Sequence, residues 1–169
     1  MRDVLTGKPR IRLLATDVDG VLTDGGMYFG VDGQMMKRFC VKDGQGMALL
    51  RDAGVRLAFI TADTSEICRA RGEKLRVHDV CIGVPDKSEA LTAIMEREGI
   101  ARDEVVYMGD DLPDLCLAPI AGVFAAPADA AEEVLAVAGY VTKNRGGYGA
   151  MREVCDAIRA HNAALDAQN

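Results

Sequence analysis

The sequence lacks the features of several protein classes. It has no excess of basic residues: its formal net charge is −6, which argues against nucleic acid or an anionic membrane as a partner. No apolar run approaches the roughly 20 residues of a membrane span, and the start MRDVLTGKPR lacks the apolar centre of a secretory signal. The five cysteines are scattered without a CxxC pair, as in proteins that keep reduced thiols. We therefore expect a cytoplasmic protein that binds neither nucleic acid nor membrane.

The composition that is present indicates a globular protein. Hydrophobic residues make up 49% of the chain and charged residues 27%, and no low-complexity stretch interrupts them. A length of 169 residues suits one hydrophobic core. We expect a single domain over residues 1–169, with a core at about 11–158 and a tail at 159–169.

Apolar runs alternate with helical patterns almost to the end of the chain. The runs predict buried strands at Ile11–Asp17, Val55–Thr61, Val105–Gly109 and Gly122–Ala125. Helical spacing is found at Gly46–Ala53, Ser65–Leu75, Lys87–Glu98, Leu112–Pro119 and Tyr148–His161. This alternation predicts an α/β fold of the Rossmann-like kind, in which helices cover both faces of a parallel sheet.

One segment departs from this alternation. Residues 27–40 predict a projecting β-hairpin, because Asp32-Gly33 is a strong hairpin-turn signal. The apolar side chains of this segment are Met27, Tyr28, Phe29, Met35, Met36 and Phe39. A free hairpin would expose too much apolar surface with these residues. We therefore predict that the hairpin packs between subunits.

Two carboxylates, Asp17 and Asp19, stand at the end of the first predicted strand. Side chains two residues apart on an extended chain point the same way, so the two groups repel each other. Burial would add a further cost unless a cation or a chemical role compensates. Asp17, Asp19 and Asp110 together offer the hard oxygen ligands that Mg²⁺ prefers, and a bound cation would relieve the repulsion.

Further chemically suggestive residues follow the other predicted strands, where ligands bind in open parallel sheets. Thr61 ends the second strand, Lys87 begins a helix, and Asp110 and Asp111 follow the third strand. A hydroxyl and an ammonium group suit the binding of a phosphate. Aspartate can attack a phosphoryl group, and a second aspartate can transfer the protons. Thr61 alone would equally suit the cap of the next helix.

These residues, in this order, resemble the four motifs of the haloacid dehalogenase superfamily. The motifs are Asp17-Val-Asp-Gly-Val-Leu-Thr-Asp-Gly, Thr61, Lys87 and Gly109-Asp-Asp-Leu-Pro-Asp114, and the resemblance covers about residues 11–158. It implies that Asp17 is a nucleophile that forms an aspartyl-phosphate and that Asp19 is the general acid and base. It also implies that Mg²⁺ is held by the Asp17 carboxylate, the Asp19 carbonyl and Asp110, with Asp111 just outside these ligands. Thr61 and Lys87 would bind phosphate.

Within the superfamily, the chain is similar to phosphatases of 3-deoxy-D-manno-octulosonate 8-phosphate, which produce free KDO for lipopolysaccharide. The similar segments are Asp17–Gly26 with the hairpin, Lys42–Gly46, Val84–Lys87, Gly109–Leu112 and Gly146–Cys155. This resemblance implies a phosphoric monoester hydrolase that acts on a sugar-acid phosphate. It also implies a homotetramer.

Two alternatives to this function stay open. Thr61-Ala-Asp63 stands where that group usually has Thr-Gly-Arg, and Arg69–Leu75 is similar to phosphatases of nine-carbon ulosonate (KDN or N-acylneuraminate) 9-phosphates. With either substrate, Arg71 and Lys74, three residues apart on one helix, could receive a sugar carboxylate, although a solvated helix face explains them equally well. The other alternative is a non-catalytic partner domain of a sugar-nucleotide synthetase, which the complete set of chemical groups disfavours.

The spacing of the motifs leaves no room for a separate lid. The intervals at positions 20–60 and 62–86 are each shorter than the roughly 50 residues that a domain generally needs. We therefore expect a fold without a cap domain. Because an acyl-phosphate must be protected from uncontrolled water, a neighbouring subunit is the natural cover.

Overall fold

The computed structural model describes residues 1–168, and Asn169 and the side chains of Arg2, Gln34 and Met35 lie outside the described part. Six strands form one sheet in the order β5-β4-β1-β6-β7-β8, and every neighbouring pair is parallel. The strands are β1 (Leu13–Thr16), β4 (Arg56–Ile60), β5 (Asp79–Cys81), β6 (Val105–Met108), β7 (Val123–Ala126) and β8 (Tyr140–Val141). The predicted parallel α/β sheet is confirmed.

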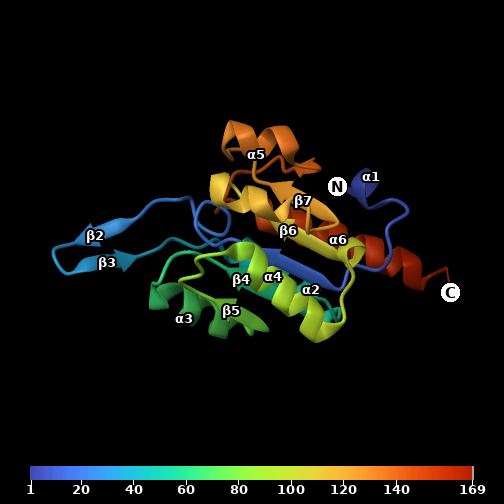
Figure 1. Ribbon diagram of the computed structural model, residues 1–169, viewed down its shortest axis with the longest axis horizontal. Coiled ribbons are helices and arrows are strands. Elements are labelled where there is room, and N and C mark those ends of the chain that lie inside the picture. Colours follow the sequence, from blue (N-terminus) through green and yellow to red (C-terminus); the bar gives the residue numbers. More distant parts are fainter. Residues whose placement is uncertain (169) are drawn as a thin grey trace.

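Helices cover both faces of this sheet (Figure 1). They are α1 (Arg2–Leu5), α2 (Val41–Asp52), α3 (Glu66–Leu75), α4 (Lys87–Glu98), α5 (Glu132–Val137) and α6 (Ala150–Asp166), with 3₁₀ turns η1 (Arg102–Glu104) and η2 (Leu112–Leu117). Successive side chains of β1 enter opposite layers of the core, because a strand alternates its faces. Leu14 joins the cluster that holds Met151 of α6, whereas Leu13 joins the cluster that holds Leu91 of α4.

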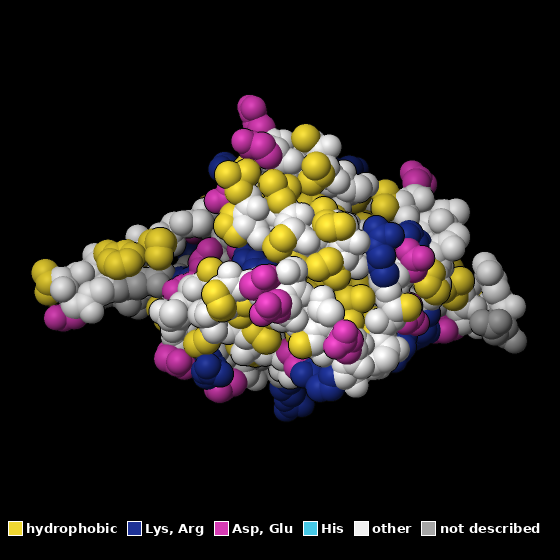
Figure 2. Space-filling view, viewed as in Figure 1, with side chains coloured by type: hydrophobic (Ala, Val, Ile, Leu, Met, Phe, Trp, Pro, Cys, Tyr) yellow, Lys and Arg dark blue, Asp and Glu magenta, His cyan; other side chains and the backbone are white. Residues whose placement is uncertain are grey.

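The hairpin projects from the body of the molecule, at the end opposite to both termini (Figure 1). It consists of β2 (Tyr28–Gly30) and β3 (Gly33–Met36), which pair in antiparallel fashion around the turn residues Val31 and Asp32. Its large apolar side chains are exposed, as the yellow atoms along it in Figure 2 show: Met27, Tyr28, Phe29, Val31 and Met36. Phe39 instead packs against the core. Within residues 1–168, this hairpin is the insertion between β1 and α2, so the fold has no cap domain.

Several boundaries differ from the sequence predictions. Helix α2 begins at Val41 rather than at Gly46, because Gly44 and Gly46 lie against arginine side chains of α3 and α6 and allow close packing instead of breaking the helix. The predicted helix at 112–119 is a 3₁₀ turn. Residues 159–166, predicted as a tail, continue helix α6. Helices α1 and α5 and strand β8 were not predicted, since elements this short show no clear periodicity.

The described residues contain no helix that is long and apolar enough to span a membrane. All five cysteines are free. Burial raises the pKa of the Cys68 thiol to about 11 and also raises that of Cys155, so both stay protonated at neutral pH.

One buried carboxylate joins the first turns of α2 and α6. The residue that precedes helix α6 is Gly149, whose φ of +110° favours glycine. Glycine has no side chain that could cap the helix. Asp43 of α2 supplies the missing cap: its carboxylate accepts the backbone N–H of Gly149 at 3.2 Å and that of Arg152 at 2.8 Å. Burial raises the pKa of Asp43, and these two hydrogen bonds oppose the shift. The Lys42–Gly46 motif therefore holds the C-terminal helix in place.

Replacing Asp43 with alanine should lower the free energy of unfolding by about 1–2 kcal/mol, because two backbone donors of α6 lose their acceptor. Urea unfolding followed by circular dichroism would measure the change. The matched control is Asp52→Ala, which removes an exposed carboxylate from the other end of α2 and should change stability by less than about 0.5 kcal/mol. Equal losses in the two variants would contradict the capping role of Asp43.

Candidate active site

The carboxyl ends of three neighbouring strands gather the predicted site residues. Strand β1 lies between β4 and β6, so the residues that follow these strands meet at one edge of the sheet. A cavity of about 330 Å³ opens there. It is lined by Asp17, Asp19, Gly20, Gly25, Thr61, Ala62, Asp63, Lys87, Asp110, Asp111 and Pro113. The structure thus brings together six of the eight predicted site residues.

Lys87 is held in the cavity by two carboxylates. Its side chain is almost fully buried, and its Nζ lies 2.9 Å from Oδ2 of Asp17 and 2.7 Å from Oδ1 of Asp114. Burial opposes the charge, but attraction to Asp17 and Asp114 prevails and raises the pKa of Lys87. The helix that begins here is capped by Asp86 instead, which accepts the N–H of Ser88 at 2.8 Å. Lys87 is therefore a fixed cation at the site.

Asp114 organises this part of the site, although we did not include it among the predicted residues. It is fully buried, and its Oδ1 accepts hydrogen bonds from Lys87 and from the hydroxyl of Tyr107, each at 2.7 Å. Its Oδ2 accepts the backbone N–H of Asp110 at 3.0 Å. The sequence does not indicate this role of Asp114, because its partners Tyr107 and Lys87 come from two other elements, β6 and α4.

The carboxylates of Asp17, Asp110 and Asp114 form a group that fits a divalent cation. Their oxygen atoms lie within 4.8 Å of one another. Asp114 is already saturated with hydrogen bonds, whereas Oδ1 of Asp110 is buried without a hydrogen-bond partner among the described residues. A Cβ on Gly20 would overlap the Asp110 carboxylate, so glycine is needed beside it. An unpartnered buried oxygen among hard carboxylate donors fits Mg²⁺.

The pKa values of Asp17 and Asp110 are raised because these carboxyl groups are buried close together. Burial raises the pKa of Asp17 to about 6, against the attraction of Lys87. Burial, followed by repulsion from Asp17, raises the pKa of Asp110 to about 8. Without a metal, Asp110 therefore retains its proton at neutral pH and Asp17 retains its proton at slightly acidic pH, and a cation would release both protons.

Lys37 is a site residue that the sequence analysis missed. It follows β3 at the base of the hairpin, and its side chain is completely inaccessible to solvent. Its Nζ donates to the carboxylates of Asp19 and Asp63. Burial disfavours the charge, but these hydrogen bonds outweigh burial and hold the pKa of Lys37 above its ordinary value. The sequence does not indicate that a lysine at the end of an exposed hairpin is buried. Only the folded chain brings Lys37 next to Asp19 and Asp63.

Thr61 and Asp111 also lie at the cavity. Thr61 is buried, and its hydroxyl accepts the N–H of Asp63 at 3.2 Å. The cap of α3 is Ser65, so the alternative in which Thr61 caps that helix is wrong. Asp111 is exposed and accepts the N–H of Leu112 at 2.8 Å, which caps η2.

Arg71 and Lys74 do not line the cavity. The guanidinium of Arg71 lies 5.1 Å from the centre of the Phe39 ring, a cation–π contact between α3 and the segment before α2. Lys74 is exposed on α3. Their predicted contact with a sugar carboxylate stays a prediction.

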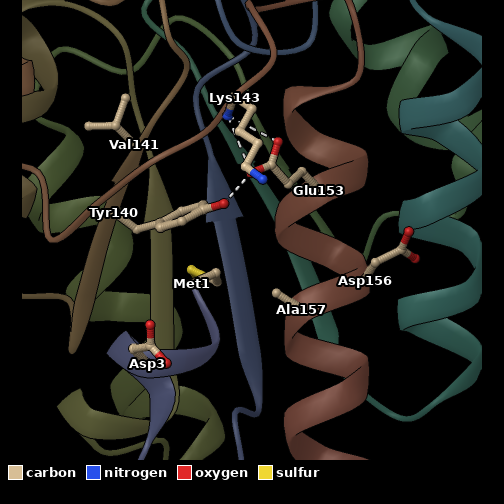
Figure 3. Close-up of a pocket in the computed structure, with 8 residues that line it drawn as sticks. All are labelled: Met1, Asp3, Tyr140, Val141, Lys143, Glu153, Asp156 and Ala157. Carbon is tan, nitrogen blue, oxygen red and sulfur yellow. Dashed lines mark hydrogen bonds between the residues drawn. The ribbon is translucent and has the colours of Figure 1, made fainter.

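A larger cavity, of about 720 Å³, lies between α1, β8 and α6 (Figure 3). None of the predicted site residues lines it. Glu153 of α6 points into it and accepts hydrogen bonds from the hydroxyl of Tyr140 and the backbone N–H of Lys143. The central carboxylate of this cavity is thus already paired, in contrast to the unpartnered Asp110.

Carboxylates and a buried lysine at the carboxyl edge of a parallel sheet suit a protein that binds a divalent cation and transfers a phosphoryl group. The sequence profile of haloacid dehalogenase-like hydrolases matches residues 60–150. The chain belongs to this family, which confirms the resemblance read from its motifs.

Within this family, the chain is similar to several individual phosphatases. The chain is 37% identical over 164 residues to the 3-deoxy-D-manno-octulosonate 8-phosphate phosphatase KdsC of Escherichia coli (strain K12), and the match covers 97% of this chain and 87% of that protein. The phosphatase of the same name from Moraxella catarrhalis, solved with a magnesium ion, a phosphate ion and KDO, superposes with a TM-score of 0.91 at 36% identity, over 99% of this chain and 96% of that one. The cobalt-bound enzyme from Haemophilus influenzae gives a TM-score of 0.88 at 34% identity, over 91% and 90% of the two chains.

The stabilisation of this protein by Mg²⁺ should increase between pH 6 and pH 8. Because the pKa values of Asp17 and Asp110 are raised to about 6 and about 8, the metal-free folded chain holds protons that the unfolded chain has lost. The stability that these two groups contribute is therefore present at low pH and is lost as the pH rises through those values. Mg²⁺ replaces the protons, so the gain in melting temperature should be larger at pH 8.

Thermal unfolding with and without Mg²⁺ at the two pH values would measure this gain. Asp110→Asn places a neutral side chain at the same position and should lose most of the Mg²⁺-dependent gain at both pH values. An undiminished gain in this variant would show that Asp110 does not hold the metal.

Proposed function

We propose that this chain is a Mg²⁺-dependent phosphatase that hydrolyses 3-deoxy-D-manno-octulosonate 8-phosphate to KDO and phosphate. The observation that carries the proposal is the placement of Asp17 in the cavity, 2.9 Å from the ammonium group of Lys87 and beside the unpartnered oxygen of Asp110. The names and bound molecules of the relatives support the substrate. The reaction yields a precursor of lipopolysaccharide, and we place it in the cytoplasm.

The side chains divide the chemistry as follows. A carboxylate oxygen of Asp17 attacks phosphorus, and the bond from phosphorus to the sugar oxygen breaks as the aspartyl-phosphate forms. Asp19 donates a proton to the leaving sugar oxygen and later takes a proton from the water that attacks phosphorus. That second attack breaks the bond from phosphorus to Asp17 and releases inorganic phosphate. Thr61 and Lys87 bind the phosphoryl oxygens, and the ammonium group offsets their negative charge.

Three groups would hold Mg²⁺: the Asp17 carboxylate, the backbone carbonyl of Asp19 and the Asp110 carboxylate, with Asp111 beside them. When bound, the cation offsets negative charge on the phosphoryl group and on the carboxylates around it. Asp114 contributes by fixing the backbone of Asp110 and the ammonium group of Lys87.

Lys37 orients the acid and base in this scheme. Its ammonium group holds one oxygen of Asp19, and the other oxygen faces the hydroxyl of Thr23 at 3.4 Å. A carboxylate fixed from both sides loses little rotational freedom on binding substrate. The hairpin therefore contributes a residue to the site through its base.

A nine-carbon ulosonate 9-phosphate is the second candidate substrate. Asp63 lies in the cavity wall and is tied to Lys37, so an acid occupies the place where the eight-carbon group usually has arginine. Arg71 and Lys74 do not line the cavity of their own chain, and their contact with a sugar carboxylate stays a prediction. A non-catalytic partner domain is disfavoured, since all the residues to which we assign catalysis or metal binding line one cavity.

Asp17→Asn should reduce phosphate release by about 10⁴-fold or more, because the amide is not a nucleophile for phosphorus. The assay would compare an eight-carbon ulosonate 8-phosphate, nine-carbon ulosonate 9-phosphates and hexose phosphates in the presence of Mg²⁺. We expect the eight-carbon substrate to have the highest kcat/KM. The control is Asp103→Asn, an exposed carboxylate on η1 that should leave the rate unchanged.

Preference for a nine-carbon substrate would instead favour the second candidate. Full activity in Asp17→Asn would exclude the aspartyl-phosphate mechanism. No release from any substrate by the wild-type protein would favour the non-catalytic partner domain.

We propose further that the protein is a homotetramer with the hairpin between subunits. The support is the exposed apolar surface of the hairpin, on which Phe29 is 66% exposed and Met36 57% exposed. A neighbouring copy would bury this surface and would cover the open cavity, since the chain has no cap of its own.

The double variant Phe29→Ser/Met36→Ser should dissociate the tetramer, because it removes apolar contact area at the proposed interface. Sedimentation velocity would show the change in mass. Val137→Ser, at a similarly exposed site on α5, should leave the assembly intact. A monomeric wild-type protein, or a tetramer that persists in the double variant, would contradict this placement of the hairpin.

A further inference from the structure

The glycine-rich loop before α6 lies directly against the loop that carries Asp19. Gly146 is buried, and a Cβ on it would overlap the carbonyl oxygen of Gly20. Gly147 has a φ of +67° and donates its N–H to the carbonyl of Val21 at 2.9 Å. The two loops therefore touch backbone to backbone, and no side chain lies between them.

The loop that carries Asp19 and Gly20 also contacts the Asp110 carboxylate, on the side opposite to Gly146. A Cβ on Gly20 would overlap that carboxylate. Asp110, Gly20 and Gly146 thus form a stack in which each member sets the position of the next. In a close-packed stack of this kind, a shift of Gly146 must move Gly20 and the neighbouring carbonyl of Asp19.

The segment from Asp129 to Ala131, in the loop after β7, connects the two ends of this stack by hydrogen bonds. Oδ1 of Asp129 accepts the N–H of Gly146 at 2.9 Å. Two residues later, the N–H of Ala131 donates to the carbonyl of Asp110 at 2.8 Å. One short segment therefore holds both ends of the stack, which are the glycine loop and the backbone of Asp110.

We infer that Asp129 and Gly146 are positioning residues that fix the separation between the Asp19–Gly20 backbone and the Asp110 carboxylate, and thereby set the affinity for Mg²⁺. This assignment rests on the proposed function, because it requires the cation to lie between these two groups. The carboxylate of Asp129 acts through its hydrogen bond with the N–H of Gly146, while the backbone of Ala131, two residues later, holds the carbonyl of Asp110. The other contact of Asp129, with Nε of the largely exposed Arg145 at 3.1 Å, is a surface ion pair of the kind that contributes little.

Three variants separate the hydrogen bond from the ion pair. Asp129→Ala removes both contacts, Asp129→Asn keeps an oxygen that can accept the N–H of Gly146, and Arg145→Ala removes the ion pair alone. Isothermal titration calorimetry with MgCl₂, in the absence of substrate, would measure the affinity for the metal. Asp129→Ala should raise the Kd for Mg²⁺ by about tenfold, the usual effect of losing a group that orients a ligand.

Asp129→Asn and Arg145→Ala should bind Mg²⁺ within about twofold of the wild type, because both keep the acceptor for Gly146. At saturating Mg²⁺, Asp129→Ala should recover most of its kcat with an unchanged KM for the substrate. Gly146→Ala should weaken Mg²⁺ binding further, and circular dichroism would establish that it folds.

A lower melting temperature of Asp129→Ala with wild-type Mg²⁺ affinity would show a purely structural role and would overturn the inference while leaving the proposed function intact. Equal losses of affinity in Asp129→Ala and Arg145→Ala would overturn it as well, because the ion pair would then be responsible. A wild-type protein that binds no Mg²⁺ would overturn both the inference and the proposed function.

Discussion

Repulsion among the carboxylates at the carboxyl edge of the sheet is the constraint on which the rest of the site depends. Asp17, Asp110 and Asp114 lie close enough to share one cation, and burial makes their mutual repulsion stronger. Hydrogen-bond donors held in fixed positions reduce this repulsion. Lys87 stands between Asp17 and Asp114, and the hydroxyl of Tyr107 completes the hydrogen bonds of Asp114. The repulsion that remains falls on Asp110, the proposed metal ligand, whose Oδ1 has no hydrogen-bond partner in the described part of the chain.

The parallel topology explains why so few residues are needed for this arrangement. Because β1 is flanked by β4 and β6, three short strands bring Asp17, Thr61 and Asp110, the proposed nucleophile, phosphate-binding hydroxyl and metal ligand, to one edge. Backbone hydrogen bonds then fix the loops that carry them, and glycines let these loops touch. Flexible side chains contribute mainly the charges. This division is consistent with catalysis by a preorganised electrostatic environment.

The sequence was sufficient for those parts of the fold and site that local patterns encode. Apolar runs such as Val105–Gly109 and the acidic residues after them placed the strands and Asp110 correctly, because strand ends and their loops are contiguous in the chain. Lys37 and Asp114 were not predicted as site residues, since their partners lie far away in sequence and only the fold brings them together. The same limit explains Arg71, whose charge suggested a ligand but whose guanidinium lies against Phe39.

The position of Lys37 has a consequence for how this fold can change. Lys37, which directly follows β3, contacts Asp19, so the proposed subunit interface and the residue proposed to orient Asp19 belong to one short segment. Near the tip of the hairpin, Phe29 and Val31 are exposed, so the packing of their own chain places little constraint on these two side chains. The base of the hairpin is more constrained. A hairpin exchanged between related enzymes would keep its function only if the exchanged piece includes the lysine and its spacing from the first strand.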